Sequence, residues 1–141
     1  MDLEIRKIQY EDMTPVISIL KNALSNFEPG VSAHKQIWSE FSSQPNVLGY
    51  VGIFNLQVIM YCSVFVETKI RGGKVGYIQD FAVLASHQKQ GLGSEMLNFL
   101  TAELSEMGCY KISLSTLVEN VEFYKKNGFT QLEFSMQKIL N

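Results

Sequence analysis

A short glycine-containing run has the clearest chemical potential in this chain. It follows an apolar stretch at 77–83, opens an amphipathic segment, and reads Gln88, Lys89, Gln90, Gly91, Leu92, Gly93, Ser94. Free backbone N–H groups at the start of a helix attract anions such as phosphate. Two glycines one residue apart let the main chain approach a bulky anion, because neither carries a Cβ atom. The run therefore predicts a phosphate-binding turn, and the alternative is that its glycines only shape a helix start.

Two other glycine-rich phosphate loops are excluded by their spacing. A Walker loop requires G-x-x-x-x-G-K-[ST], and no such string occurs in this sequence. The dinucleotide-binding fingerprint requires a third glycine three residues after the second, but Met96 stands there. The remaining pattern is Q-x-x-G-x-G between an expected strand and an expected helix.

The composition is that of an ordinary globular protein. The chain has 141 residues, of which 46% are hydrophobic and 18% charged, and this length predicts one domain over 1–141. A net charge of −2 without a lysine or arginine cluster argues against a nucleic-acid partner. Because no run of 18 apolar residues occurs, we expect no membrane span.

The cysteines and histidines do not predict a metal site. Cys62 and Cys109 lie in apolar, strand-like runs and lack metal-ligand spacing with His34 or His87, so we expect buried thiols and no metal. The N-terminal residues lack the basic region and apolar run of a secretion signal. These features favour a protein of the cytoplasm.

The first half of the sequence predicts a strand, two helices and then several strands. Alternating apolar residues indicate a strand at 3–8, and Asp12 or Thr14 is a candidate cap for a helix that reaches Leu24. Ser32 is a candidate cap for a second helix through Phe41. β-Branched and aromatic residues then predict strands at 47–54, 58–67 and 75–83.

The second half predicts a helix, a strand, a short helix and a last strand. Apolar residues at four-residue spacing indicate a helix from Leu92, which Gly108 would end in a left-handed conformation. A half-buried strand is expected at 111–116, and Asn120 is placed to cap a short helix that ends at 127–128. The run 129–140 predicts a long last strand, so the expected order is β-α-α-β-β-β-α-β-α-β.

Two downstream segments give the glycine-containing run a more specific meaning. The strings CYKISL at 109–114 and NVEFYKKNGF at 120–129, together with Gly91-Leu92-Gly93, resemble the GNAT family of N-acetyltransferases. Within it they are most similar to the glucosamine 6-phosphate N-acetyltransferases. The resemblance implies the acetyltransferase fold of the α/β (α+β) class, with a mixed, mostly antiparallel sheet flanked by helices.

The resemblance also implies that acetyl-CoA is the acyl donor. Backbone amides from Gln88 to Gly93 would hold its pyrophosphate, the Ser94 hydroxyl would add a donor, and Asn120 would contact the cofactor as well as cap its helix. The main chain of Phe81, Ala82 and Val83 would pair with the pantetheine arm as an added strand. A backbone N–H there would stabilise the acetyl oxygen.

Tyr124 matches the family tyrosine that protonates or hydrogen-bonds the leaving thiolate, although it could instead be a packing residue beside Phe123. The resembled subfamily shows Glu-Asp where this chain has Gln79-Asp80, and a glutamine cannot act as a base. The proton of the amine would therefore pass to Asp80 or a water relay, or the amine would arrive partly neutral. Asp80 could equally be a structural hydrogen-bond acceptor.

The acceptor half departs further from the resembled subfamily, which uses an arginine in its last strand. Gln137 and Lys138 stand at that position, and lysine does not reproduce the bidentate fork of arginine on a phosphate. The other acceptor-binding candidates are Ser25, Gln79, Asp80, Tyr110 and Lys111. Trp38 is either core or a wall of the acceptor pocket, and Arg71 and Lys74 either assist or are solvated charges.

Together these features predict direct acetyl transfer from acetyl-CoA to a primary amine of a small molecule, with an amino-sugar phosphate as a candidate acceptor. By analogy with the family we expect a homodimer in which the last strand could be exchanged. One alternative is a different amine, such as an amino acid, a polyamine or a peptide N-terminus. The other is a CoA-binding module without turnover, because Gln79 has displaced a base.

Overall fold

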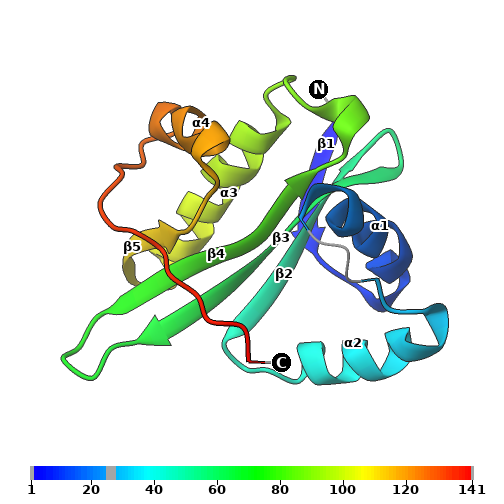
Figure 1. Cartoon of the computed structure of the whole chain (residues 1–141), viewed down its shortest axis with the longest axis horizontal. Coiled ribbons are helices and arrows are strands. Elements are labelled where there is room, and N and C mark those ends of the chain that lie inside the picture. Colours follow the sequence, from blue (N-terminus) through cyan, green and yellow to red (C-terminus); the bar gives the residue numbers. More distant parts are fainter. Residues whose placement is uncertain (1, 25–27, 141) are drawn as a thin grey trace.

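The computed structural model of the chain describes residues 2–24 and 28–140 and is shown in Figure 1. Its strands are β1 (Leu3–Lys7), β2 (Val47–Phe54), β3 (Gln57–Thr68), β4 (Lys74–Val83) and β5 (Cys109–Leu114). Its α-helices are α1 (Met13–Ala23), α2 (His34–Ser42), α3 (Leu92–Glu106) and α4 (Val121–Lys126). The elements predicted up to residue 128 are confirmed, with shifts of one to a few residues at their ends.

The strands form one sheet in the order β1-β2-β3-β4-β5, antiparallel except for the parallel pair β4 and β5. Helices α1 and α2 lie on one side of the sheet and α3 and α4 on the other (Figure 1). Val16 of α1 packs on Val51 and Tyr61, whereas the residues of α3 pack on the opposite face. The prediction of a mixed sheet flanked by helices is confirmed.

The main core lies between α3 and the sheet. Leu92, Met96, Leu100 and Leu104 recur every four residues and are at most 1% exposed, as their spacing predicts. Each such side chain contributes roughly 1.5–3 kcal/mol on burial. The helix ends at Gly108, whose φ of 91° confirms the expected left-handed conformation. This packing holds the first turn of α3 beside the end of β4.

The predicted last strand at 129–140 is wrong for the single chain, because these residues have no regular secondary structure. The segment leaves α4 and runs across the front of β4 towards α2 (Figure 1). Leu132, Phe134 and Met136 alternate as a strand would, yet they are between 81% and 94% exposed. A strand needs a neighbour for its hydrogen bonds, and within the described chain this segment has no paired neighbour in the sheet.

Candidate active site

A bulge in β4 places the residues of the site. Ser63 of β3 is opposite Gln79, and Tyr61 is opposite Ala82, so two residues of β4 oppose a single residue of β3. Asp80 takes up the extra length with a φ of 51°. This left-handed conformation costs a non-glycine residue roughly 1–2 kcal/mol, and strain of this kind recurs at active sites. The Ser63 hydroxyl donates to the Gln79 carbonyl at 3.3 Å.

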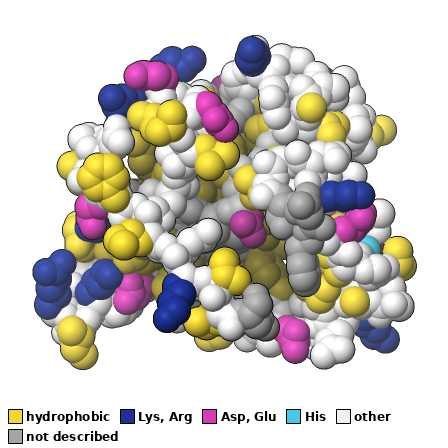
Figure 2. Space-filling view, viewed as in Figure 1, with side chains coloured by type: hydrophobic (Ala, Val, Ile, Leu, Met, Phe, Trp, Pro, Cys, Tyr) yellow, Lys and Arg dark blue, Asp and Glu magenta, His cyan; other side chains and the backbone are white. Residues whose placement is uncertain are grey.

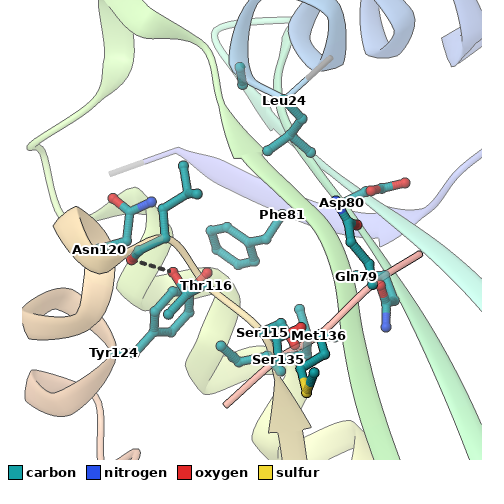
Figure 3. Close-up of a pocket in the computed structure, with 15 residues that line it drawn as sticks. Leu24, Gln79, Asp80, Phe81, Ser115, Thr116, Asn120, Tyr124, Ser135 and Met136 are labelled. Atoms are coloured by element: carbon teal, nitrogen blue, oxygen red, sulfur yellow. Dashed lines mark hydrogen bonds between the residues drawn. The ribbon is translucent and has the colours of Figure 1, made fainter. Parts of the chain in front are cut away.

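The bulge also changes which side chains face which side of the sheet. Ile78 and Phe81 both contact the core under α3, although an unbroken strand would send residues three apart to opposite faces. Between them, Gln79 and Asp80 are both exposed. Figure 3 shows Phe81 on one side of β4, pointing towards Tyr124, and Asp80 and Gln79 on the other side.

A cavity opens where β4 and β5 separate. The pairing of these strands ends at Ile78 and Leu114, but β4 continues to Val83 with one edge free. The cavity has a volume of about 520 Å³, and Figure 2 shows the same face hollowed near its centre. It is lined by Ala23, Leu24, Ile78, Gln79, Asp80, Phe81, Leu114, Ser115, Thr116, Leu117, Asn120, Tyr124, Ser135, Met136 and Gln137.

Tyr124 is held in the cavity wall by aromatic contacts. Its ring meets those of Phe81, Phe123 and Phe129 edge to face, with centroids at 6.4, 5.0 and 5.7 Å. Burial, assisted by the nearby Cys62, raises the pKa of Tyr124 to about 12. The phenol therefore stays protonated at neutral pH, and it can donate a hydrogen bond to an anion.

The turn before α3 has the backbone shape of an anion site. Lys89 and Gly91 both have positive φ values, of 62° and 82°. Among the described residues no side chain caps α3 at Gly91, so amides of its first turn keep their donors for a ligand. The Gln88 side chain donates to the Val83 carbonyl at 3.0 Å and so joins this turn to the end of β4.

The charge of the cavity is negative. Among the described residues that line it, Asp80 carries the single formal charge, and none is lysine, arginine or histidine. A carboxylate without a neighbouring cation attracts a protonated amine. In the part of the chain that the structure describes, no group of three metal-ligating side chains is present, and no helix there has the length and apolar character to cross a bilayer.

The structure brings together many of the predicted site residues but not all. Gln79, Asp80, Phe81, Asn120 and Tyr124 line the cavity. Near α1, Val83 and Gln88 line a second cavity of about 70 Å³.

Other candidates lie elsewhere. Tyr110 and Lys111 lie at the opposite end of β5 from the cavity, where the Lys111 amino group sits 5.7 Å above the Tyr110 ring. Lys138 follows Gln137 but is absent from the described lining. Ser25 lies outside the described residues.

Asn120 stands at the N-cap of α4, as predicted, but its side chain makes no capping hydrogen bond within the described chain. A 3-10 turn at Val118–Asn120 enters the helix in place of the expected side-chain cap. The Asn120 side chain is drawn beside the cavity in Figure 3. Its amide is therefore available to a ligand.

Sequence reasoning missed the residues that close the cavity from distant parts of the chain. Ser115, Thr116 and Leu117 directly follow the end of β5. Their position after this strand would have marked them as lining residues if the separation of β4 from β5 had been expected. Leu24 comes from the end of α1. The segment 129–140 after α4, which we call the tail, contributes Ser135 and Met136, for which the sequence carries no separate signal.

With this geometry in hand, comparison with known proteins assigns the family. The model of the acetyltransferase (GNAT) family matches residues 4–129, so the chain belongs to that family. Glucosamine 6-phosphate N-acetyltransferase of Candida albicans is 36% identical over 98 residues, which cover 67% of this chain and 66% of that protein. The Arabidopsis thaliana enzyme of the same name is 37% identical over 78 residues, 54% of this chain and 52% of that protein.

The match in three dimensions covers more of the chain. A crystal structure of glucosamine-6-phosphate N-acetyltransferase from Arabidopsis thaliana superposes with a TM-score of 0.90, 26% identity and full coverage of both chains. The resemblance drawn from the sequence and the expected acetyltransferase fold are thus confirmed. By sequence, however, the chain spans only about half to two thirds of the first two relatives.

Proposed function

We propose that this protein is an acetyl-CoA-dependent N-acetyltransferase that moves acetyl directly to a primary amine of a small molecule. One observation carries the proposal: the strained bulge at Asp80, the free edge of β4 and the phenol of Tyr124 all border one cavity. The uncapped start of α3 lies beside Phe81, one of the residues that line this cavity. Such a site can hold a phosphorylated thioester on one wall and an amine on the other.

Donor binding is assigned to the elements around the free edge of β4. Backbone N–H groups of the run Gln88 to Gly93 would hold the pyrophosphate, helped by the Ser94 hydroxyl. The unpaired main chain of Phe81, Ala82 and Val83 would accept the pantetheine arm as an additional strand. When bound, acetyl-CoA supplies the acetyl group as an activated thioester.

Tyr124 is assigned as the residue that stabilises the leaving sulfur. A thiol has a pKa of roughly 8.5 and is already a good leaving group, so it needs little proton transfer. Because burial raises the pKa of Tyr124 to about 12, the phenol would act by donating a hydrogen bond and would keep its proton. Its three aromatic neighbours would hold the hydroxyl in one direction.

Asp80 is assigned as the acceptor of the amine's proton. Its carboxylate is exposed on the side of β4 opposite Tyr124 (Figure 3), so a water molecule would carry the proton between the amine and Asp80. Asn120 and the Gln79 amide would orient the two substrates from the same cavity. Since Asp80 is the single formal charge on the described lining, the protonated amine would be drawn to this side.

An amino-sugar phosphate is the acceptor that the relatives suggest. The Candida albicans and Arabidopsis thaliana relatives are named for glucosamine 6-phosphate. Within the described lining no cation is present to hold a phosphate. Lys138 follows the lining residue Gln137 in the sequence and is our candidate cation for the phosphate. Ser25, Tyr110 and Lys111 are further proposed acceptor contacts, which a second subunit could bring in.

A homodimer would complete the site. The tail at 129–140 alternates exposed apolar residues but has no paired strand in the described chain, which is the pattern of a strand that pairs with a second copy. We further propose that residues 1–141 form one N-acetyltransferase domain. The two free thiols, Cys62 and Cys109, support a reducing compartment such as the cytoplasm.

The test is a panel of amines with acetyl-CoA, followed by the release of free thiol. The panel contains glucosamine 6-phosphate, glucosamine, an amino acid, a polyamine and a peptide N-terminus. We expect turnover with glucosamine 6-phosphate to exceed that with glucosamine, and Lys138→Ala to narrow that difference. Turnover with only an amino acid, a polyamine or a peptide N-terminus would favour the alternative that this enzyme acetylates a different amine. Tight CoA binding by calorimetry with no turnover on any amine would overturn the enzyme proposal and favour a binding module.

A further inference from the structure

The ring of Phe81 occupies an unusual place in the cavity. The bulge turns its side chain to the α3 side of the sheet, and Figure 3 shows the ring pointing from β4 into the gap between β4 and α4. There it meets Phe123 at 6.3 Å and Tyr124 at 6.4 Å between centroids. The Phe81 ring therefore fills part of the space where β4 and β5 separate.

The chemistry of a thioester places its alkyl group beside this ring. This step rests on the proposed function, in which the sulfur lies at Tyr124 and the carbonyl oxygen meets a backbone N–H of the bulge. The carbonyl carbon has one remaining substituent, the alkyl chain, and the amine approaches from the Asp80 side. Phe81 is the side chain that leaves the bulge on the side of Tyr124, so its ring would border the alkyl chain of a bound thioester.

We propose that Phe81 is the specificity-determining residue that limits the transferred acyl group to acetyl. The ring is backed by Phe123, and the Phe123 ring packs so closely over Gly93 that a Cβ atom placed there would lie 3.0 Å from it. A longer acyl chain would have to displace this packed pair of rings. One additional methylene in such a pocket changes specificity by roughly 10-fold to 200-fold.

The two other rings around Tyr124 have different positions. Phe129 packs against Tyr124 at 5.7 Å but does not line the cavity, so it supports the phenol without bordering a ligand. Phe123 backs both Phe81 and Tyr124 and likewise is absent from the described lining. Phe129 is therefore a matched control, since its loss disturbs Tyr124 but leaves in place the Phe81 ring, which we call the acyl wall.

The experiment compares kcat/KM for acetyl-, propionyl- and butyryl-CoA in wild type, Phe81→Ala and Phe129→Leu. Wild type should prefer acetyl over propionyl by about tenfold or more. Phe81→Ala should reduce that preference by about tenfold, even if it lowers every rate by loosening Tyr124. Phe129→Leu should lower all three rates by the same factor. Phe81→Val serves in the same way if Phe81→Ala does not fold.

Binding gives a second readout that does not depend on turnover. Calorimetry with S-ethyl and S-butyl coenzyme A thioethers should show weaker binding of the longer chain to wild type and nearly equal binding to Phe81→Ala. If wild type transfers acetyl but the chain-length ratios are unchanged in both Phe81 variants, the acyl-wall inference is overturned. If wild type neither binds these thioethers nor transfers acetyl, the proposed function itself fails.

Discussion

The two walls of the cavity are built in different ways. The wall that we assign to the donor, called the donor wall, is made of β4 and the start of α4, with the start of α3 next to it, and contains Phe81, Asn120 and Tyr124. The acceptor wall combines the end of α1 with residues 135–137 of the tail, more than 100 residues apart, and with Gln79 and Asp80. Segments nearer to one another in the sequence therefore build the first wall, whereas the second joins segments more than 100 residues apart.

This difference has a consequence for what substitutions do. The donor wall continues into the main core, since Phe81, Phe123 and Tyr124 pack against the buried residues under α3. The acceptor wall is more open, because Asp80 and the tail residues are exposed. We expect changes in the donor wall to affect all acceptors alike, and changes in the acceptor wall to alter rate and selectivity while donor affinity stays the same.

The largest effect is expected at the boundary of the two walls, from Asp80→Asn. Asparagine tolerates a positive φ, so the bulge should remain while the base is lost. A general base contributes about 100-fold or more to the rate, and kcat at neutral pH should fall by roughly this factor. The fall in kcat is measured by the release of free thiol, and the affinity for acetyl-CoA, measured by calorimetry, is the control.

A second substitution sharpens this result. Gln79→Glu in the Asp80→Asn background places a carboxylate on the same exposed side of β4, one residue away. It should recover part of the lost kcat. Unchanged turnover in Asp80→Asn alone would remove Asp80 from the mechanism and leave it as a structural residue.

The next effect concerns Tyr124→Phe in the donor wall. A hydrogen bond to a charged group is worth about 1.5–3 kcal/mol, so kcat should fall by roughly 10-fold to 100-fold with every acceptor. Affinity for acetyl-CoA should change little, because the aromatic packing is preserved. A loss confined to one acceptor would contradict the separation of the two walls.

The same tyrosine makes a prediction for alkaline pH. In the proposed mechanism the neutral phenol is the active form, and the pKa of Tyr124 is raised from 10.0 to about 12. Its activity should therefore persist through pH 10 and decline only as the pH approaches the raised value. The prediction would be contradicted if kcat of wild type falls near pH 10 while kcat of Tyr124→Phe shows no such fall.

A smaller effect is expected from Gly91→Ala in the turn before α3. Gly91 has a φ of 82° with no atom within 4 Å of a Cβ position, so alanine brings backbone strain but no clash. That strain is roughly 1–2 kcal/mol and should weaken CoA binding by about tenfold if the turn opens.

Gly108→Ala is the matched control for this change. It has a φ of 91°, an equally empty Cβ position, and lies at the other end of α3. Both variants should lose similar stability in thermal melts, but only Gly91→Ala should lose affinity for CoA in calorimetry. Equal CoA affinity in the two variants would count against a phosphate-binding role for the turn.

The smallest effect lies outside both walls, at Tyr50. Its hydroxyl is buried beneath α3 and, among the described residues, lacks a hydrogen-bond partner. Tyr50→Phe should raise stability by about 1 kcal/mol, because an unsatisfied buried polar group is removed. Acetyl transfer should be unchanged, and a fall in the melting temperature would show that the hydroxyl has a partner.

Titration gives this prediction a second measurement. Burial raises the pKa of Tyr50 to about 12, above its ordinary value of 10.0. As the pH rises, Tyr50 therefore loses its proton in the unfolded chain before it does so in the folded chain. Its contribution to the free energy of unfolding falls as the pH rises from about 10 to 12. Alkaline melts of Tyr50→Phe should show a smaller loss over this interval than wild type.

The sequence by itself determined the local elements to which we assign donor binding. Periodicity predicted α3 and its end at Gly108, and the strings at 88–94, 109–114 and 120–129 led to the GNAT family. These features are local, because helix faces, turns and phosphate-binding amides depend on residues a few positions apart. Tyr124 and Asn120 were identified from the same strings before their shared cavity was known.

Only the tertiary structure decided the rest. Nothing local predicts the left-handed Asp80, since a bulge depends on how two strands pair, and that bulge directs Phe81 to Tyr124. The alternation at 132–136 predicted a strand that forms only where a partner supplies hydrogen bonds, so the tail remains irregular in the single chain. The proposed phosphate-binding turn follows from local sequence, whereas the proposed acceptor wall depends on contacts between segments that the sequence keeps far apart.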